Sequence, residues 1–155
     1  MKIEFMEKAM ELAKQSNCSR RSVAVLAVKD EQIILTAYNM TIIPQSSCMS
    51  VHTCIRSDVP SGERLEYCWA IHAEQSLILK ALEQGISLCD VLIYCTTQPC
   101  STCCKMLIMA GVAGIYYAES YPTEFTDKII EAVQQQRPFI FEQIPYDKKR
   151  KRILL

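Results

Sequence analysis

Residues 91–118 read VLIYCTTQPCSTCCKMLIMAGVAGIYYA. This stretch begins with an apolar run at 91–96, continues with residues that favour a helix at 101–110, and ends with a second apolar run at 114–118. Strand, helix and strand in this order indicate a right-handed crossover between two parallel strands. The stretch therefore predicts an α/β fold, in which the segment Pro99–Cys103 lies where a strand ends and a helix begins.

The flanking sequence supplies the other elements of this fold. Apolar residues at helical spacing and short valine-rich or isoleucine-rich runs mark them. The predicted elements are helices over 3–14, 73–83 and 126–135, and strands over 23–28, 32–38 and 138–144. We expect a hairpin turn at 29–31. Together the elements predict one domain, residues 1–155, with three α/β/α layers and a mixed five-stranded sheet.

Residues 40–70 interrupt this regular pattern. They contain Pro44, Pro60, Gly62 and three cysteines, with no sustained periodicity. We interpret them as an inserted loop region, because long loops inside compact domains are usually functional or braced by another group. At the other end of the chain, the basic residues within 147–155 are expected to form a solvated tail.

The composition excludes several function classes. Seventeen basic residues balance seventeen acidic ones, so no net charge attracts a polynucleotide. No run approaches the roughly 18 apolar residues that span a bilayer, and the first residues lack the apolar core of a secretory signal. Nine cysteines cannot all pair within the chain. We therefore expect a cytoplasmic protein with reduced thiols and no membrane partner.

Two short motifs carry candidate chemistry, and each opens a predicted helix: His72-Ala73-Glu74 and Pro99-Cys100-Ser101-Thr102-Cys103. The spacing of Cys100 and Cys103 places both sulfurs on one side of a first helical turn, where the helix dipole favours thiolates. With His72 as the third ligand they would hold Zn²⁺ and leave one tetrahedral position open for water, as in catalytic zinc sites. Glu74 is placed to act as the base beside that position.

Histidine-x-glutamate followed by proline-cysteine-x-x-cysteine is the pattern of zinc-dependent nucleobase deaminases. The likeness extends beyond this motif, and residues 5–125 resemble the deoxycytidylate (dCMP) deaminase family of the cytidine deaminase-like superfamily. The resembling segments are Cys18–Val23, Ala37–Asn39, Pro60–Arg64, His72–Gln75, Thr96–Cys100, Ala110–Val112 and Tyr121–Pro122. The resemblance implies the cytidine deaminase-like fold, hydrolytic conversion of dCMP to dUMP with release of ammonia, and a homo-oligomer.

The resemblance also implies roles for residues around the metal. Asn39 would contact the base or sugar, Ala73 would offer its backbone to the base, and Tyr121 would pack near the nucleotide. Arg20 or Arg21 would contact the 5′-phosphate. The alternatives are a solvated pair for the two arginines and a core or interface aromatic for Tyr121.

Four further cysteines, Cys18, Cys48, Cys54 and Cys68, lie at or inside the insertion. The resemblance implies a second, structural zinc there, because four thiolates form a closed tetrahedral site. His52 competes with Cys54 as a ligand of that site, and partly buried free thiols are the alternative to it. We interpret the remaining cysteines as small apolar residues of the core; these are Cys89, Cys95 and Cys104.

The chain departs from the family pattern at two places. Ala37-Tyr38-Asn39-Met40 stands where the family has Gly-Tyr-Asn-Gly, and Ser76 stands where it has Asn. Glycines at such a turn permit backbone angles and a close approach of ligand that Ala and Met resist.

Because of these departures, two other hypotheses for the function stay open. One is a deaminase of another free nucleoside, nucleobase or modified cytosine, and the other is a catalytically inactive, zinc-stabilised binding module.

Overall fold

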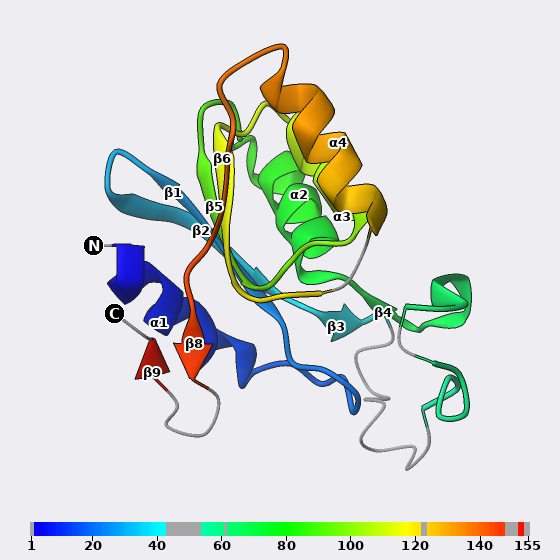
Figure 1. Cartoon of the computed structure of the whole chain (residues 1–155). Coiled ribbons are helices and arrows are strands. Elements are labelled where there is room, and N and C mark those ends of the chain that lie inside the picture. Colours follow the sequence, from blue (N-terminus) through cyan, green and yellow to red (C-terminus); the bar gives the residue numbers. More distant parts are fainter. Residues whose placement is uncertain (1, 43–53, 61, 122–123, 148–151, 154–155) are drawn as a thin grey trace.

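The computed structural model describes residues 2–42, 54–60, 62–121, 124–147 and 152–153. Its centre is a five-stranded sheet in the order β2-β1-β5-β6-β7 (Figure 1). The strands are β1 (Ala24–Lys29), β2 (Gln32–Tyr38), β5 (Leu92–Thr97), β6 (Gly114–Glu119) and β7 (Ile140–Gln143). Strand β1 pairs antiparallel with β2 and β5, whereas β5, β6 and β7 run parallel. The predicted mixed sheet and the parallel crossover are confirmed.

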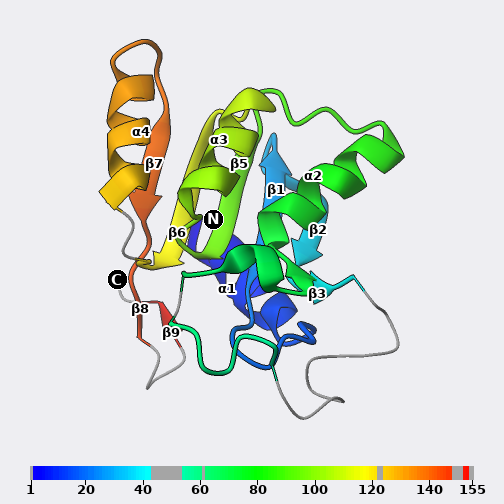
Figure 2. The same ribbon diagram turned by 90° about the vertical axis from the view of Figure 1, so that its right-hand side faces the viewer.

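Helices cover both faces of this sheet, which confirms the α/β/α layering. Helix α1 (Lys2–Ala13) lies on one face, while α2 (Ala73–Gln84), α3 (Ser101–Met109) and α4 (Glu124–Gln134) lie on the other (Figures 1 and 2). Asp30 and Glu31 form the two-residue turn of the β1–β2 hairpin, and both have positive φ, 48° and 62°. Such a turn matches the twist of the paired strands.

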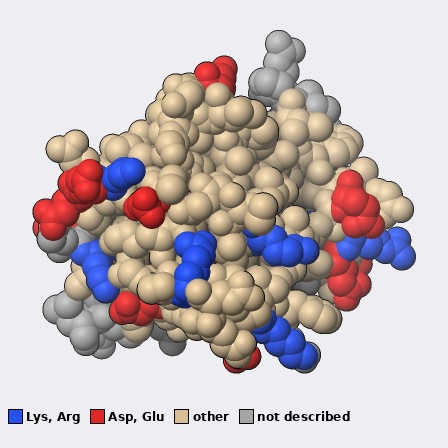
Figure 3. Space-filling view, turned by 90° about the horizontal axis from the view of Figure 1, so that it is seen from above, with Lys and Arg blue, Asp and Glu red and all other residues tan. Residues whose placement is uncertain are grey.

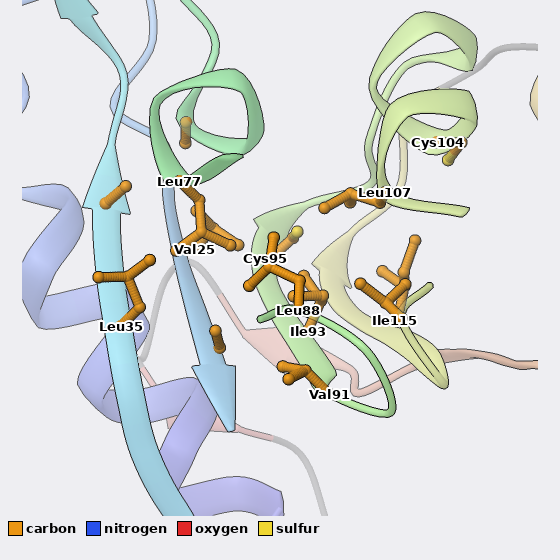
Figure 4. Close-up of a cluster of buried hydrophobic side chains, with 14 of the residues drawn as sticks. Val25, Leu35, Leu77, Leu88, Val91, Ile93, Cys95, Cys104, Leu107 and Ile115 are labelled. Atoms are coloured by element: carbon orange, nitrogen blue, oxygen red, sulfur yellow. The ribbon is translucent and has the colours of Figure 1, made fainter. Parts of the chain in front are cut away.

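Two apolar cores result, because successive side chains of a strand point to opposite faces. Val25 of β1 faces the helices α2 and α3, where it packs in one cluster with Leu77 and Leu107 (Figure 4). Its neighbour Leu26 faces α1 and packs in a second cluster with Met6. Burying a leucine side chain fully contributes about 1.5–3 kcal/mol, so both helical layers are held to the sheet by apolar contact.

The two ends of the insertion, which we call its neck, are joined by a short antiparallel ladder. Strand β3 (Met40–Thr41) pairs with β4 (Ala70–Ile71), and a 3-10 helix, η1, spans Leu65–Tyr67. Asn17 joins the neck to the segment before β1, because its amide donates to Thr41 Oγ1 at 3.0 Å and accepts from the Thr41 N–H at 2.9 Å. The two ends of the predicted loop region are therefore fixed to the domain.

The end of the chain is paired as well. Strand β8 (Tyr146–Asp147) lies antiparallel to β9 (Arg152–Ile153), with Tyr146 opposite Ile153. The predicted tail thus contains a two-stranded pairing, while the basic residues between these strands lie outside the described part of the chain. Within the described part, every helix is too short or too polar to cross a membrane.

Gly114, at the start of β6, offers a test of the parallel pairing between β6 and the edge strand β7. A Cβ added there would lie 2.5 Å from Ile140 Cβ and 2.9 Å from Ile140 O. We expect Gly114→Ala to lower the free energy of unfolding by about 1–3 kcal/mol through overpacking, as measured by urea denaturation. Hydrogen exchange of the Ile144 amide, which donates to Tyr117 O at 2.7 Å, should accelerate.

The matched control for this change is Gly85→Ala. Gly85 ends α2 with φ of 64°, and a Cβ added there meets no atom within 4 Å. The substitution strains the backbone locally without touching β7. Unchanged Ile144 exchange in Gly114→Ala, or equal acceleration in both variants, would contradict the proposed contact.

Candidate active site and metal centre

The ends of two helices bring the candidate ligands together. His72 is the N-cap of α2, and its carbonyl accepts the Ser76 N–H at 3.0 Å. Cys100 is the N-cap of α3, three residues after the end of β5, and its carbonyl accepts the Cys104 N–H at 2.9 Å. Both positions lie at the positive ends of helix dipoles, which favour negative charge. The fold therefore builds the site from two helix N-termini.

His72, Cys100 and Cys103 form a compact group of ligand atoms. These atoms all lie within 4.8 Å of one another, and no other such group of three or more His, Cys, Asp or Glu occurs among the described residues. His72 Nδ1 lies 3.6 Å from Cys100 Sγ and 3.4 Å from Cys103 Sγ. One small cation between these atoms can be bound by all three.

The three side chains hydrogen-bond to one another at the place where a cation would lie. A hydrogen bond from Cys103 lowers the pKa of Cys100 to about 4, whereas the bond with Cys100 and burial raise the pKa of Cys103. The hydrogen bond with Cys100 also raises the pKa of His72. A metal ion replaces such protons on thiols and imidazole. Two sulfurs, one imidazole nitrogen and one open position fit zinc in tetrahedral geometry.

Glu74 provides a carboxyl group beside these ligands. It lies in the first turn of α2, only 4% exposed, and burial raises the pKa of the carboxyl. Glu74 is nevertheless one of the residues that line the adjacent cavity. The carboxyl can therefore reach a bound molecule while staying shielded from bulk water.

The predicted site residues surround one cavity of about 280 Å³. This volume is close to the lower end of small-molecule sites, about 300–1,000 Å³. The predicted residues that line the cavity are Cys18, Arg20, Arg21, Asn39, Cys54, Cys68, His72, Ala73, Glu74, Cys100 and Tyr121. Cys103 is fully buried and is not part of the lining. Residues far apart in the sequence thus meet at one place.

Asn39 supports the wall of this cavity through its side-chain amide. Its Oδ1 accepts the Val23 N–H at 2.8 Å, and its Nδ2 donates to Arg21 O at 2.7 Å. Ser16 Oγ donates to the Asn39 carbonyl at 3.0 Å. Asn39 therefore holds the segment before β1 in place, and its contact with base or sugar stays a prediction.

The two predicted phosphate ligands have other partners in this structure. The Arg20 guanidinium donates to Arg56 O at 2.6 Å and to Val59 O at 3.0 Å, so it binds the backbone of the insertion. The Arg21 guanidinium lies 5.0 Å from the centre of the Tyr121 ring. Both side chains are exposed. Arg20 thus ties the insertion to the domain, and Arg21 stacks on the cavity wall.

Sequence reasoning missed three residues that shape this cavity. Arg56 is buried in its wall, and Gln98 Oε1 accepts the Tyr121 N–H at 3.1 Å. Gly62 leaves room for Tyr121, because a Cβ at Gly62 would lie 2.6 Å from the Tyr121 hydroxyl oxygen. Gly62 and Gln98 lie within segments that carry the family resemblance. Arg56 had no pattern around it apart from its closeness in sequence to Cys54.

Only part of the expected second metal site lies among the described residues. Cys18, Cys54 and Cys68 line the cavity but form no ligand group among the described residues, and Cys48 and His52 lie outside those residues. The second zinc therefore stays a prediction. Of the other cysteines, Cys95 and Cys104 are fully buried as expected. Cys89 is exposed, with Sγ donating to Asp90 Oδ2 at 3.5 Å, so its interpretation as a core residue was wrong.

Comparisons with known proteins agree with this site. The family model of the cytidine and deoxycytidylate deaminase zinc-binding region matches residues 1–119. ComE operon protein 2 of Bacillus subtilis (strain 168) is 36% identical over 120 residues, which cover 77% of this chain and 59% of that protein. Deoxycytidylate deaminase of Schizosaccharomyces pombe is 34% identical over 119 residues, which cover 76% of this chain and 36% of that protein.

The structural match covers more of both chains. The dCMP deaminase from the cyanophage S-TIM5, in complex with dCMP and dUMP, has a TM-score of 0.69 and 28% identity, covering 90% of this chain and 93% of that chain. The chain spans less than two thirds of the length of the two curated relatives, 59% and 36%. The matched segment is therefore part of each of these relatives rather than its whole length.

Metal analysis tests the ligand assignment. We expect Cys103→Ser to lose about one equivalent of zinc per chain, because removing one of three protein ligands opens the site. Exposed Cys89→Ser is the control and should keep the zinc content of the unmodified chain. Equal zinc content in Cys103→Ser and the control would contradict the site. The second zinc has its own test. If the unmodified chain holds one zinc per chain and Cys48→Ser holds the same amount, the second zinc is excluded.

Proposed function

The chain belongs to the cytidine and deoxycytidylate deaminase family, and from that premise we propose that it converts dCMP and water to dUMP and ammonia. The observation that carries the proposal is the group of His72, Cys100 and Cys103 beside the buried Glu74, where His72, Cys100 and Glu74 line one cavity. A purely structural metal site needs no carboxyl beside an open coordination position. This arrangement therefore favours catalysis over an inactive binding module.

In the proposed reaction the metal ligands and Glu74 have different roles. When bound by His72, Cys100 and Cys103, zinc supplies a Lewis acid that makes water a better nucleophile near neutral pH. Glu74 takes a proton from the attacking water and delivers it to the ring nitrogen next to the amino-bearing carbon. The water oxygen bonds to that carbon, and Glu74 then takes the remaining proton of this oxygen and passes it to the amino group, so that the carbon–nitrogen bond breaks, ammonia leaves and a carbonyl remains.

The first turn of α2 also orients the base in this proposal. Ala73 is the first residue of the helix and lines the cavity. Backbone N–H groups of a first helical turn have no acceptor within the helix. The Ala73 N–H is therefore a donor for an acceptor of the base, and the family resemblance implies that the Ala73 backbone contacts the base. Tyr121 lines the same cavity beside Gly62.

Two comparisons support dCMP as the substrate. The Schizosaccharomyces pombe relative is a deoxycytidylate deaminase, and the cyanophage structure is a dCMP deaminase in complex with dCMP and dUMP. The chain is also electrically neutral overall. On the face in Figure 3, Lys and Arg side chains are separated by uncharged ones rather than gathered in one continuous patch. These features favour a free nucleotide over a polynucleotide substrate.

We extend the proposal to a homo-oligomer. Large apolar side chains are exposed on the helices that cover the second face of the sheet. They include Leu82 of α2, which is 79% exposed, and Met109 of α3, which is 85% exposed. Contact between copies of the chain would remove such side chains from water, which is favourable.

A screen of ammonia release tests the substrate. The compounds are cytidine, deoxycytidine, CMP, dCMP, dCTP and the corresponding purines, with the zinc-loaded chain. We expect dCMP to have the highest kcat/KM. If another compound has a higher kcat/KM than dCMP, that compound is the substrate and dCMP is not. If no compound releases ammonia, the inactive binding module is favoured.

Glu74→Gln tests the catalytic assignment. The amide keeps the shape of the side chain but cannot carry protons, so we expect kcat to fall about 10²- to 10⁴-fold or more while zinc stays bound. Glu83→Gln, an exposed change in the same helix, is the control and should keep normal turnover. Substantial dCMP turnover by zinc-loaded Glu74→Gln would refute the role of Glu74.

A further inference from the structure

Arg56 is a buried cation in the wall of the cavity. Its side chain comes from the insertion and lines the cavity, although the residue is only 6% exposed. The guanidinium donates from Nε at 3.1 Å and from Nη2 at 2.6 Å, both to the carbonyl oxygen of Glu63. A guanidinium has five N–H donors, so these two bonds leave three of them for other acceptors.

The charge of Arg56 has no counter-ion in the described part of the chain. The ion pairs of Lys2 with Glu142 and of Lys14 with Glu11 lie on the exposed surface, away from Arg56. A carbonyl oxygen satisfies a hydrogen bond but does not neutralise a charge. Arginine keeps its proton in proteins, and burying an unpaired charge is costly unless an anion compensates it.

The anionic groups in the rest of the lining belong to the metal site. Glu74 is the one carboxylate among the described residues that line the cavity, and Cys100, whose pKa is lowered to about 4, is one of the metal ligands beside it. Arg20 and Arg21 also line the cavity, but they are exposed to water and are held by backbone carbonyls and by the Tyr121 ring. The charge that needs an anionic partner most is therefore that of Arg56.

We propose that Arg56 is the specificity-determining residue that binds the phosphate of the nucleotide, in place of the Arg20 or Arg21 expected from sequence. The assignment rests on the proposed function, which supplies a substrate with a phosphate monoester. A guanidinium binds phosphate oxygens with two parallel hydrogen bonds. A buried position excludes water from that contact and so strengthens it. Arg20 acts through Arg56, since its bond to the Arg56 carbonyl positions that residue.

The test compares dCMP with deoxycytidine, which differ in the phosphate alone. In Arg56→Gln we expect the ratio of kcat/KM for dCMP to that for deoxycytidine to fall about 10- to 100-fold. The value for deoxycytidine should fall less than that for dCMP, because deoxycytidine has no phosphate contact to lose. Arg56→Lys keeps the positive charge but lacks the planar guanidinium with its paired donors, so the ratio of the two kcat/KM values should fall less than in Arg56→Gln. Arg64→Gln is the matched control in the same insertion, exposed and outside the lining, and should keep the normal ratio.

A merely structural Arg56 would give a different result. Equal losses for dCMP and deoxycytidine in Arg56→Gln and Arg56→Lys, or an unchanged ratio in both, would overturn the proposal. If Arg56→Gln does not fold, as shown by its circular dichroism, the ratio in Arg56→Lys decides alone.

A binding measurement separates this proposal from the proposed function. Calorimetric titration of Glu74→Gln with dCMP and with deoxycytidine needs no turnover. Tighter binding of dCMP that is lost in Glu74→Gln/Arg56→Gln supports the phosphate contact even if the unmodified chain releases no ammonia. Equal affinity of Glu74→Gln for the two compounds overturns the phosphate contact even if deamination is established.

Discussion

The meeting of two helix N-termini at one edge of the sheet is the constraint on which this structure depends. Helix α3 begins there because the parallel strand β5 ends there, and α2 begins there after the ladder of β3 and β4 closes the insertion. Both helix dipoles point their positive ends at the same place. Sulfur and carboxyl groups that would be unfavourable in an apolar core are stabilised at this position, so His72, Glu74, Cys100 and Cys103 can share one site.

The insertion completes this site from the other side, and hydrogen bonds to backbone carbonyls hold it. Arg20 binds the carbonyls of Arg56 and Val59, and Arg56 binds the carbonyl of Glu63. A segment without a helix or strand pattern thereby becomes a defined wall. The same bonds place one arginine at the surface and one in the interior, which gives the two residues different electrostatic roles.

Much of the fold followed from periodicity, which depends on residues close in sequence. The apolar runs at 91–96 and 114–118 and the helical spacing between them predicted the parallel crossover that the structure contains. The insertion lacked such a pattern, so its ladder, its 3-10 helix and the contact between Gly62 and Tyr121 were not predicted. The burial of Cys89 was predicted wrongly, because its Sγ contacts the exposed Asp90 instead of the core.

By itself the sequence predicted the group of His72, Cys100 and Cys103 that the structure brings together, and the carboxyl of Glu74, to which we assign the proton transfer. Cys100 and Cys103 are separated by less than one helical turn, and Glu74 is two residues from His72, so local helix geometry was sufficient to group each pair. Only the tertiary structure decided which arginine is buried at the cavity and which is used to hold the insertion. That choice depends on contacts between residues up to 39 positions apart, and no periodic pattern of the sequence encodes them.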